Sequence, residues 1–89
     1  MIYTYIMFNE LDHTFKIGKS KNLIKRLKTF KTSNLYLKIV LIIMGNKEKF
    51  LHNYFKSKRL SGEFFALDIN DLNDLKDFQF EINKEILAG

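Results

Sequence analysis

Residues 3–26, YTYIMFNELDHTFKIGKSKNLIKR, constrain the fold of this chain more than any other stretch. The segment 2–8 is dominated by β-branched and aromatic residues, which predicts a strand. Residues 9–13 are mostly polar and predict a turn. Residues 14–18 predict a second, short strand that Gly18 ends, because glycine permits a backbone conformation or a close approach that a Cβ would hinder. The sequence therefore predicts a hairpin, followed by a short basic helix.

The basic helix is expected over residues 21–31. Ser20 stands where an N-cap belongs. Leu23, Leu27 and Phe30 recur at helical spacing and form an apolar face. The opposite face carries Lys21, Lys25 and Lys28. The segment is therefore an amphipathic helix with a basic outer surface.

The remaining segments complete a small α+β fold. Residues 35–44, LYLKIVLIIM, form the most apolar run and are expected to be the central strand. A second helix is expected over 47–58 and a brief strand over 63–67. Asp68 is expected to cap a last helix over about 69–87. The order β-β-α-β-α-(β)-α predicts an α/β (α+β) fold with a small antiparallel sheet of three to four strands, flanked by helices.

Composition limits what the chain can be. Its 89 residues are enough for one domain with one small core, and nine Phe and four Tyr raise the area that this core buries. The absence of cysteine excludes disulfides and thiolate metal sites. The longest apolar run, residues 39–44, is too short to span a bilayer, and the N-terminus lacks the features of a signal peptide. We therefore expect an intracellular protein without a membrane partner.

Charge is distributed unevenly along the chain. Residues 1–59 carry 13 Lys or Arg against three acidic residues, whereas residues 60–89 carry two Lys against seven acidic residues. A basic body with an acidic end segment fits a phosphate-rich partner held on one face, which favours DNA. The alternative explanation is compositional bias in a chain rich in Lys, Asn and Ile.

Several groups of residues resemble the GIY-YIG nuclease superfamily. Tyr5, the segment 16–20 (KIGKS) and Arg26 resemble the tyrosine strand, the glycine turn and the arginine helix of repair nucleases in that superfamily. Residues 48–52, EKFLH, and 62–65, GEFF, are similar to its phage and viral branch, in which KIG often stands for YIG.

The resemblance covers roughly residues 2–67 and implies a reaction and a site. In the superfamily a hairpin tyrosine and the helix arginine act on the scissile phosphate, and a glutamate on a later helix binds one Mg²⁺ or Mn²⁺. This implies that Tyr5 and Arg26 are catalytic and that Glu48 is the metal ligand. Lys16 stands at the position of the second tyrosine.

The chemistry of phosphodiester cleavage selects related residues. The reaction needs an activated water, a cation to neutralise developing charge, and donors to the phosphate oxygens. Tyr5 can orient or deprotonate that water if cations such as Arg26 lower its pKa from the usual value of about 10. His52 lies four residues after Glu48 and is a candidate general base or phosphate contact. The remaining candidates are Tyr3 and Lys16 for catalysis, and Lys19, Lys21, Lys25 and Lys28 for nucleic-acid binding.

Three functions stay open on the sequence alone. The first is a metal-dependent DNA endonuclease, favoured by Tyr5, Arg26 and Glu48 together. The second is a catalytically degenerate member that binds nucleic acid or a partner protein, favoured by Lys16 in place of tyrosine. The third is a protein-interaction module that works through the acidic last helix. Because the chain is short, a homodimer or a larger targeting protein is a further candidate partner.

Overall fold

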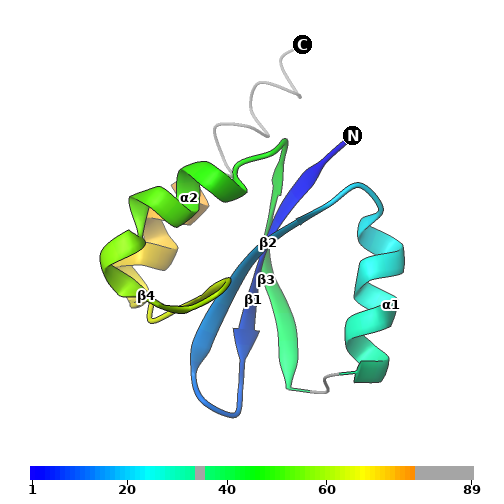
Figure 1. Cartoon of the computed structure of the whole chain (residues 1–89), viewed down its shortest axis with the longest axis horizontal. Helices are drawn as coiled ribbons and strands as arrows, with labels where there is room; N and C mark the ends of the chain where they lie inside the picture. The colour runs from blue at the N-terminus through cyan, green and yellow to red at the C-terminus, as the bar shows by residue number, and fades with distance from the viewer. Residues whose placement is uncertain (34–35, 78–89) are drawn as a thin grey trace.

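The fold has three layers: a helix, a sheet and a pair of helices (Figure 1). The structure, a computed structural model, describes residues 1–33 and 36–77. Helix α1 (Leu23–Ser33) lies on one side of the sheet. Helix α2 (Glu48–Tyr54), with the helical residues 69–77 beside it, lies on the other side. The architecture is α+β, as the sequence predicts.

The predicted hairpin is present. Strand β1 (Tyr3–Asn9) pairs antiparallel with β2 (Thr14–Ser20), so that Tyr5 lies opposite Gly18. Strand β2 continues two residues past Gly18, and the prediction that this glycine ends the strand is wrong. Its φ angle is not positive, so the absence of a Cβ at this position serves a close approach and not a chain reversal.

The antiparallel sheet has five strands where the sequence predicts three to four. The strands beyond the hairpin are β3 (Leu37–Met44), β4 (Arg59–Ser61) and β5 (Phe64–Phe65). Their order in the sheet is β3-β1-β2-β5-β4, which places the predicted central strand β3 at an edge. Leu41 and Ile43 are buried and Ile42, between them, is half-buried. Strand β3 is apolar although it lies at an edge, because Leu41 and Ile43 pack in the core and Ile42 faces the start of α1, while Val40 is 44 % exposed.

The predicted second helix is shorter than expected. Helix α2 ends at Tyr54, a 3-10 turn (Lys56–Lys58) follows, and the chain then enters β4. The described part of the predicted last helix is residues 69–77, and residues 78–89 lie outside the described ones. None of the helices within residues 1–33 and 36–77 combines the length and the apolarity needed to cross a membrane.

The main core lies between the sheet and α2. Ile6 and Ile17 of the hairpin pack in one hydrophobic cluster with Leu51 and Phe55. Leu75 belongs to the same cluster and is 1 % exposed, so the helical residues 69–77 are an integral part of the core.

The cap of α1 differs from the prediction. The backbone N–H of Lys25 donates to Oδ1 of Asn22 (3.0 Å), which makes Asn22 the capping residue. Ser20 still belongs to strand β2, and its hydroxyl accepts a hydrogen bond from the backbone N–H of Asn22 (3.1 Å). Ser20 therefore orders the link between strand and helix but does not cap the helix.

The cap of the last helix follows the prediction. The backbone N–H of Asp71 donates to Oδ1 of Asp68 (3.0 Å), and the backbone N–H of Asp68 donates to Oδ2 of Asp71 (2.9 Å). This reciprocal pair is a capping box. Nζ of Lys58 lies 2.5 Å from Oδ2 of Asp71 and 3.4 Å from Oδ2 of Asp68. The lysine thereby ties the start of the last helix to the turn after α2.

Candidate active site

The predicted catalytic tyrosine packs against the glycine of β2. Tyr5 is buried in β1, with 1 % of its surface exposed, and is the cross-strand neighbour of Gly18. A Cβ at position 18 would lie 2.5 Å from Cζ of the Tyr5 ring, a distance that real Cβ atoms do not show. Only glycine at position 18 leaves room for the phenol, so the two residues form one packing unit.

The phenol of Tyr5 interacts with the guanidinium of Arg26 on α1. Burial raises the pKa of Tyr5 above its ordinary value of 10.0, while hydrogen bonding to Arg26 and the charge of Arg26 act in the opposite direction. The net direction is upward. Arg26 does act to lower the pKa, but removing the phenol from water outweighs the single guanidinium beside it, so the condition for Tyr5 to deprotonate a water is not met.

Two carboxylates act on the same phenol. The negative charges of Glu63 and Glu48 both raise the pKa of Tyr5, and Glu63 also raises that of Arg26. Tyr5, Arg26 and Glu48 come from β1, α1 and α2, and Glu63 precedes β5. The structure thus brings Arg26 and Glu63 into electrostatic range of Tyr5 and of each other, whereas Glu48 acts on Tyr5 alone and has the smallest effect of these charges.

A buried threonine fixes the start of α2, where Glu48 is the first residue. The hydroxyl of Thr4 donates to the carbonyl of Gly45 (2.8 Å) and accepts from the backbone N–H of Lys47 (2.7 Å). Thr4 is fully buried. The sequence does not single out Thr4, because a threonine in a strand of aromatic and β-branched residues is not distinguished from any other strand residue.

His52 ties α2 to the hairpin. Its Nε2 lies 2.9 Å from the carbonyl oxygen of Ile17, and its ring packs edge-on against Phe65 with the centroids 4.9 Å apart. A carbonyl oxygen only accepts hydrogen bonds, so this contact requires a proton on Nε2. His52 thereby holds the helix that carries Glu48 against strand β2, whereas the sequence proposes a general base or a phosphate contact.

Lys16 and Glu63 form an ion pair beside the tyrosine. Nζ of Lys16 lies 3.7 Å from Oε2 of Glu63, and the lysine side chain is 15 % exposed. Lys16 is opposite Met7 in the hairpin, two residues before Gly18, and therefore lies on the same face of the sheet as Tyr5. The backbone N–H of Ile17 donates to the carbonyl of Glu63 (2.9 Å), which holds this acidic residue next to β2. The position that the resemblance gives to a second tyrosine is thus occupied by a paired cation.

The predicted DNA-binding lysines surround the junction of β2 and α1. A small hollow of about 170 Å³ at this junction contains Arg26 and Lys25. Lys19 and Lys21 line a second hollow next to it, and Lys28 is exposed further along α1. Asn22 and Thr29 complete the first hollow and Ile2 completes the second, and Ser20 belongs to both. The guanidinium that interacts with Tyr5 therefore lies at the edge of a continuous basic surface.

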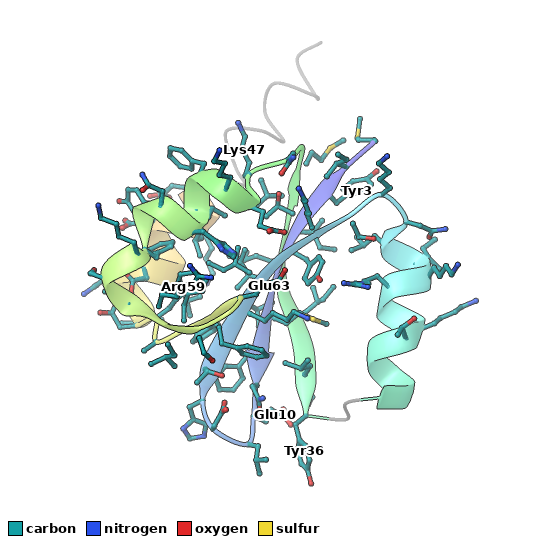
Figure 2. All side chains as sticks on the ribbon, viewed as in Figure 1. Tyr3, Glu10, Tyr36, Lys47, Arg59 and Glu63 are labelled. Atoms are coloured by element: carbon teal, nitrogen blue, oxygen red, sulfur yellow. The ribbon has the colours of Figure 1, made fainter. Side chains whose placement is uncertain are left out.

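The side chain of Tyr3 lies in a different environment from that of Tyr5. It lies at the end of the sheet near the start of α1 (Figure 2) and lines a third hollow with residues of that helix and Ile42 of β3. The structure thus separates the two tyrosines that the sequence proposes for catalysis. Tyr5 is buried beside the exposed side chain of Arg26, whereas Tyr3 is half-buried at a neighbouring surface.

The described residues provide few side chains that could bind a metal ion. Among residues 1–33 and 36–77, no three His, Cys, Asp or Glu side chains gather into a metal-binding group. Mg²⁺ does not require such a group, because it keeps several waters and is usually held by one or two carboxylates together with substrate phosphate oxygens. A single carboxylate such as Glu48, the metal ligand that the resemblance implies, would therefore be enough to hold the ion together with substrate oxygens.

A basic stripe along one helix of a small domain is the electrostatic footprint of proteins that bind nucleic acid. The chain matches the T5orf172 domain family over residues 1–80 and belongs to it. This family is a phage-type, nuclease-like or DNA-binding module associated with nucleic-acid interaction. No curated protein and no solved structure matches the chain.

Proposed function

We propose that the protein is a metal-dependent DNA endonuclease of the GIY-YIG type. The observation that carries this proposal is the contact between the buried phenol of Tyr5 on β1 and the guanidinium of Arg26 on α1, a phenol on which the charges of Glu63 and Glu48 also act. Arg26 offers a planar fork of donors that suits the non-bridging oxygens of a phosphate, and Lys25 lies in the same hollow.

The raised pKa of Tyr5 defines the role proposed for it. Below pH 10 the phenol is neutral, so it holds a proton and can share it with a substrate oxygen or orient a water. Binding of a phosphate at Arg26 would bring negative charge toward the phenol and keep it protonated. Tyr5 therefore acts as a positioned hydrogen-bonding group at neutral pH and not as a free phenolate.

The proposed metal ion is Mg²⁺ or Mn²⁺, held by Glu48. A bound divalent cation would supply stabilisation of the charge that develops on the phosphate. Glu63 is a second carboxylate for the same ion, and its ion pair with Lys16 leaves part of its side chain accessible, at 38 % exposure. Thr4 and His52 hold the two ends of α2 and thereby fix the position of Glu48.

A second candidate function is DNA binding without cleavage. The observation that favours it is Lys16, which pairs with Glu63 at the position of the second tyrosine. A lysine at this position removes one phenol from the catalytic set, while its pairing with Glu63 leaves no net charge there. The two candidates share the basic surface and differ in whether the bound phosphodiester is cut.

Substitution of the tyrosine and the arginine tests the proposed function. In cleavage of plasmid or branched DNA with Mg²⁺ or Mn²⁺, Tyr5→Phe should lower the rate by about 100-fold or more, the scale of losing a positioned proton-transfer group. Arg26→Lys should also lower the rate, because it keeps the charge but loses the bidentate fork.

Tyr36→Phe is the control, since Tyr36 lies at the other end of the sheet from Tyr3 and is 52 % exposed (Figure 2). Wild-type cleavage rates in both Tyr5→Phe and Arg26→Lys would contradict the proposal. DNA binding without any cleavage by the wild type would favour the second candidate.

A further inference from the structure

The hollow that contains Tyr3 is not used by the cleavage chemistry proposed above. It lies between the sheet and the start of α1 and has a volume of about 480 Å³. This is within the range of about 300–1,000 Å³ that ligand pockets occupy. Its lining consists of Tyr3, Lys21, Asn22, Leu23, Ile24 and Ile42.

Most of this lining is apolar although the surrounding surface is basic. Tyr3, Leu23 and Ile42 are half-buried, and Ile24 is 70 % exposed at the first turn of α1. An isoleucine this exposed, next to an aromatic ring and two aliphatic side chains, offers a flat apolar group a surface on which to pack. Aromatic rings stack on nucleobases with little preference among them, because every base has a π face.

The Tyr3 hollow adjoins the two basic hollows at the junction of β2 and α1. Asn22 lines both this hollow and the one that contains Arg26 and Lys25. Lys21 is shared with the hollow that contains Lys19. A group that packs on Tyr3 is therefore next to a surface that suits a phosphate. Nucleotides carry these two chemistries, a flat base and an anionic backbone, side by side.

We propose that the Tyr3 hollow binds one unstacked nucleobase of a DNA strand whose backbone lies at Arg26 and Lys25. The proposal rests on the proposed function for the identity of the partner as DNA. The base must be unstacked, because the two faces of a base in a regular duplex are covered by its neighbours. The substrate class is therefore DNA with an unpaired nucleotide, and a regular duplex binds through the basic surface alone.

Binding to three DNA duplexes tests this inference. The duplexes have the same sequence and are fully matched, matched except for one extra unpaired nucleotide, or matched except for an extra abasic nucleotide at the same place. Fluorescence anisotropy is measured in the presence of EDTA, so that divalent ions are removed and affinity alone is compared. We expect the duplex with the unpaired base to bind about tenfold more tightly than the abasic one, the effect of one base stacked on an aromatic ring.

Three variants test whether the preference for the unpaired base depends on the Tyr3 hollow. Tyr3→Leu should bring the affinity for the unpaired base to that for the abasic duplex, since it keeps apolar volume but removes the ring. Ile24→Ser should reduce the preference in the same direction, and the exposure of Ile24 makes this change tolerable to the fold. Tyr36→Leu, at the opposite end of the sheet, should keep the full preference (Figure 2).

The outcomes separate this inference from the proposed function. Equal, salt-sensitive binding of all three duplexes by the wild type overturns the base pocket and leaves the nuclease proposal standing. Absence of binding to any duplex at low salt overturns both. If Tyr3→Leu does not fold, the test depends on Ile24→Ser. An unchanged preference of that variant for the unpaired base over the abasic nucleotide contradicts the proposal.

Discussion

The packing of Tyr5 on Gly18 is the contact on which the candidate site depends. The sequence suggests both residues, because a tyrosine on the first strand and a glycine before the helix stand out in the pattern. It does not indicate that they are cross-strand neighbours or that the phenol occupies the space of a Cβ. It also fails to predict the pKa of Tyr5, because desolvation depends on residues from several distant segments.

The glycine can be tested directly. Gly18→Ala places a methyl group against the Tyr5 ring, so either the ring or the strand must move. We expect the free energy of unfolding to fall by about 1–3 kcal/mol, the usual cost of overpacking a well-packed region. Chemical denaturation of wild type and variant measures this difference.

The same substitution in a Tyr5→Leu background is the matched control. The shorter side chain removes the ring atoms that meet the new Cβ, so the cost of Gly18→Ala should be smaller there. Additive effects of the two substitutions would show that the glycine is needed for a reason other than the phenol.

At the scale of elements, the sequence predicts local structure well and long-range pairing poorly. The hairpin, helices α1 and α2 and the Asp68 cap follow from the local sequence pattern and capping residues. The edge position of β3 and the existence of β4 do not, because both depend on which strands meet in space. The cap of α1 is misassigned to Ser20, since Ser20 and Asn22 are both good capping residues and only the length of β2 decides between them.

The link between α2 and the hairpin provides a test of His52. His52→Phe keeps a ring against Phe65 but leaves the carbonyl of Ile17 without this partner. We expect a loss of about 1–3 kcal/mol in the free energy of unfolding, the cost of an unsatisfied, partly buried acceptor. The cleavage rate of the folded variant should change far less than the 100-fold expected for loss of a general base. A loss of activity on that scale in a protein of wild-type stability would identify His52 as catalytic.

The start of the last helix predicts a dependence of stability on pH. Hydrogen bonds from the backbone of Asp71, together with Lys58, lower the pKa of Asp68 from its ordinary value of 3.8. The folded state therefore binds this proton more weakly than the unfolded state. The stabilisation is present above pH 3.8 and is lost as the pH falls through the folded-state pKa.

Asp68→Asn keeps a capping side chain but removes the charge, whereas Asp68→Ala removes both. At pH 7 we expect the thermal midpoint to fall in the order wild type, Asn, Ala. The gap between wild type and Asn should close as the pH is lowered below 3.8. A gap that is independent of pH would contradict the assignment of the shift to the carboxylate.

In the whole molecule, the distribution of charge and the domain family both indicate a nucleic-acid partner. Arg26 and three lysines (Lys19, Lys21 and Lys25) lie around the junction of β2 and α1, while Asp68 and Asp71 lie at the start of the last helix on the other side of the sheet. This arrangement agrees with the nucleic-acid association of the T5orf172 domain family. The sequence predicts the charge asymmetry, and the structure adds that the basic surface borders the residues proposed to cut.

The proposed function requires that Glu48 hold the divalent ion when the chain cuts DNA. Glu48→Ala tests it most directly, through the cleavage rate measured with Mg²⁺ or Mn²⁺ at protein concentrations that saturate the DNA. We expect cleavage to be abolished while DNA binding, measured in EDTA and at several salt concentrations, stays close to wild type, because one acidic residue is lost from a basic surface. Lys49→Ala, an exposed neighbour on the same helix, should still cut. Cleavage by Glu48→Ala at the wild-type rate would contradict this requirement.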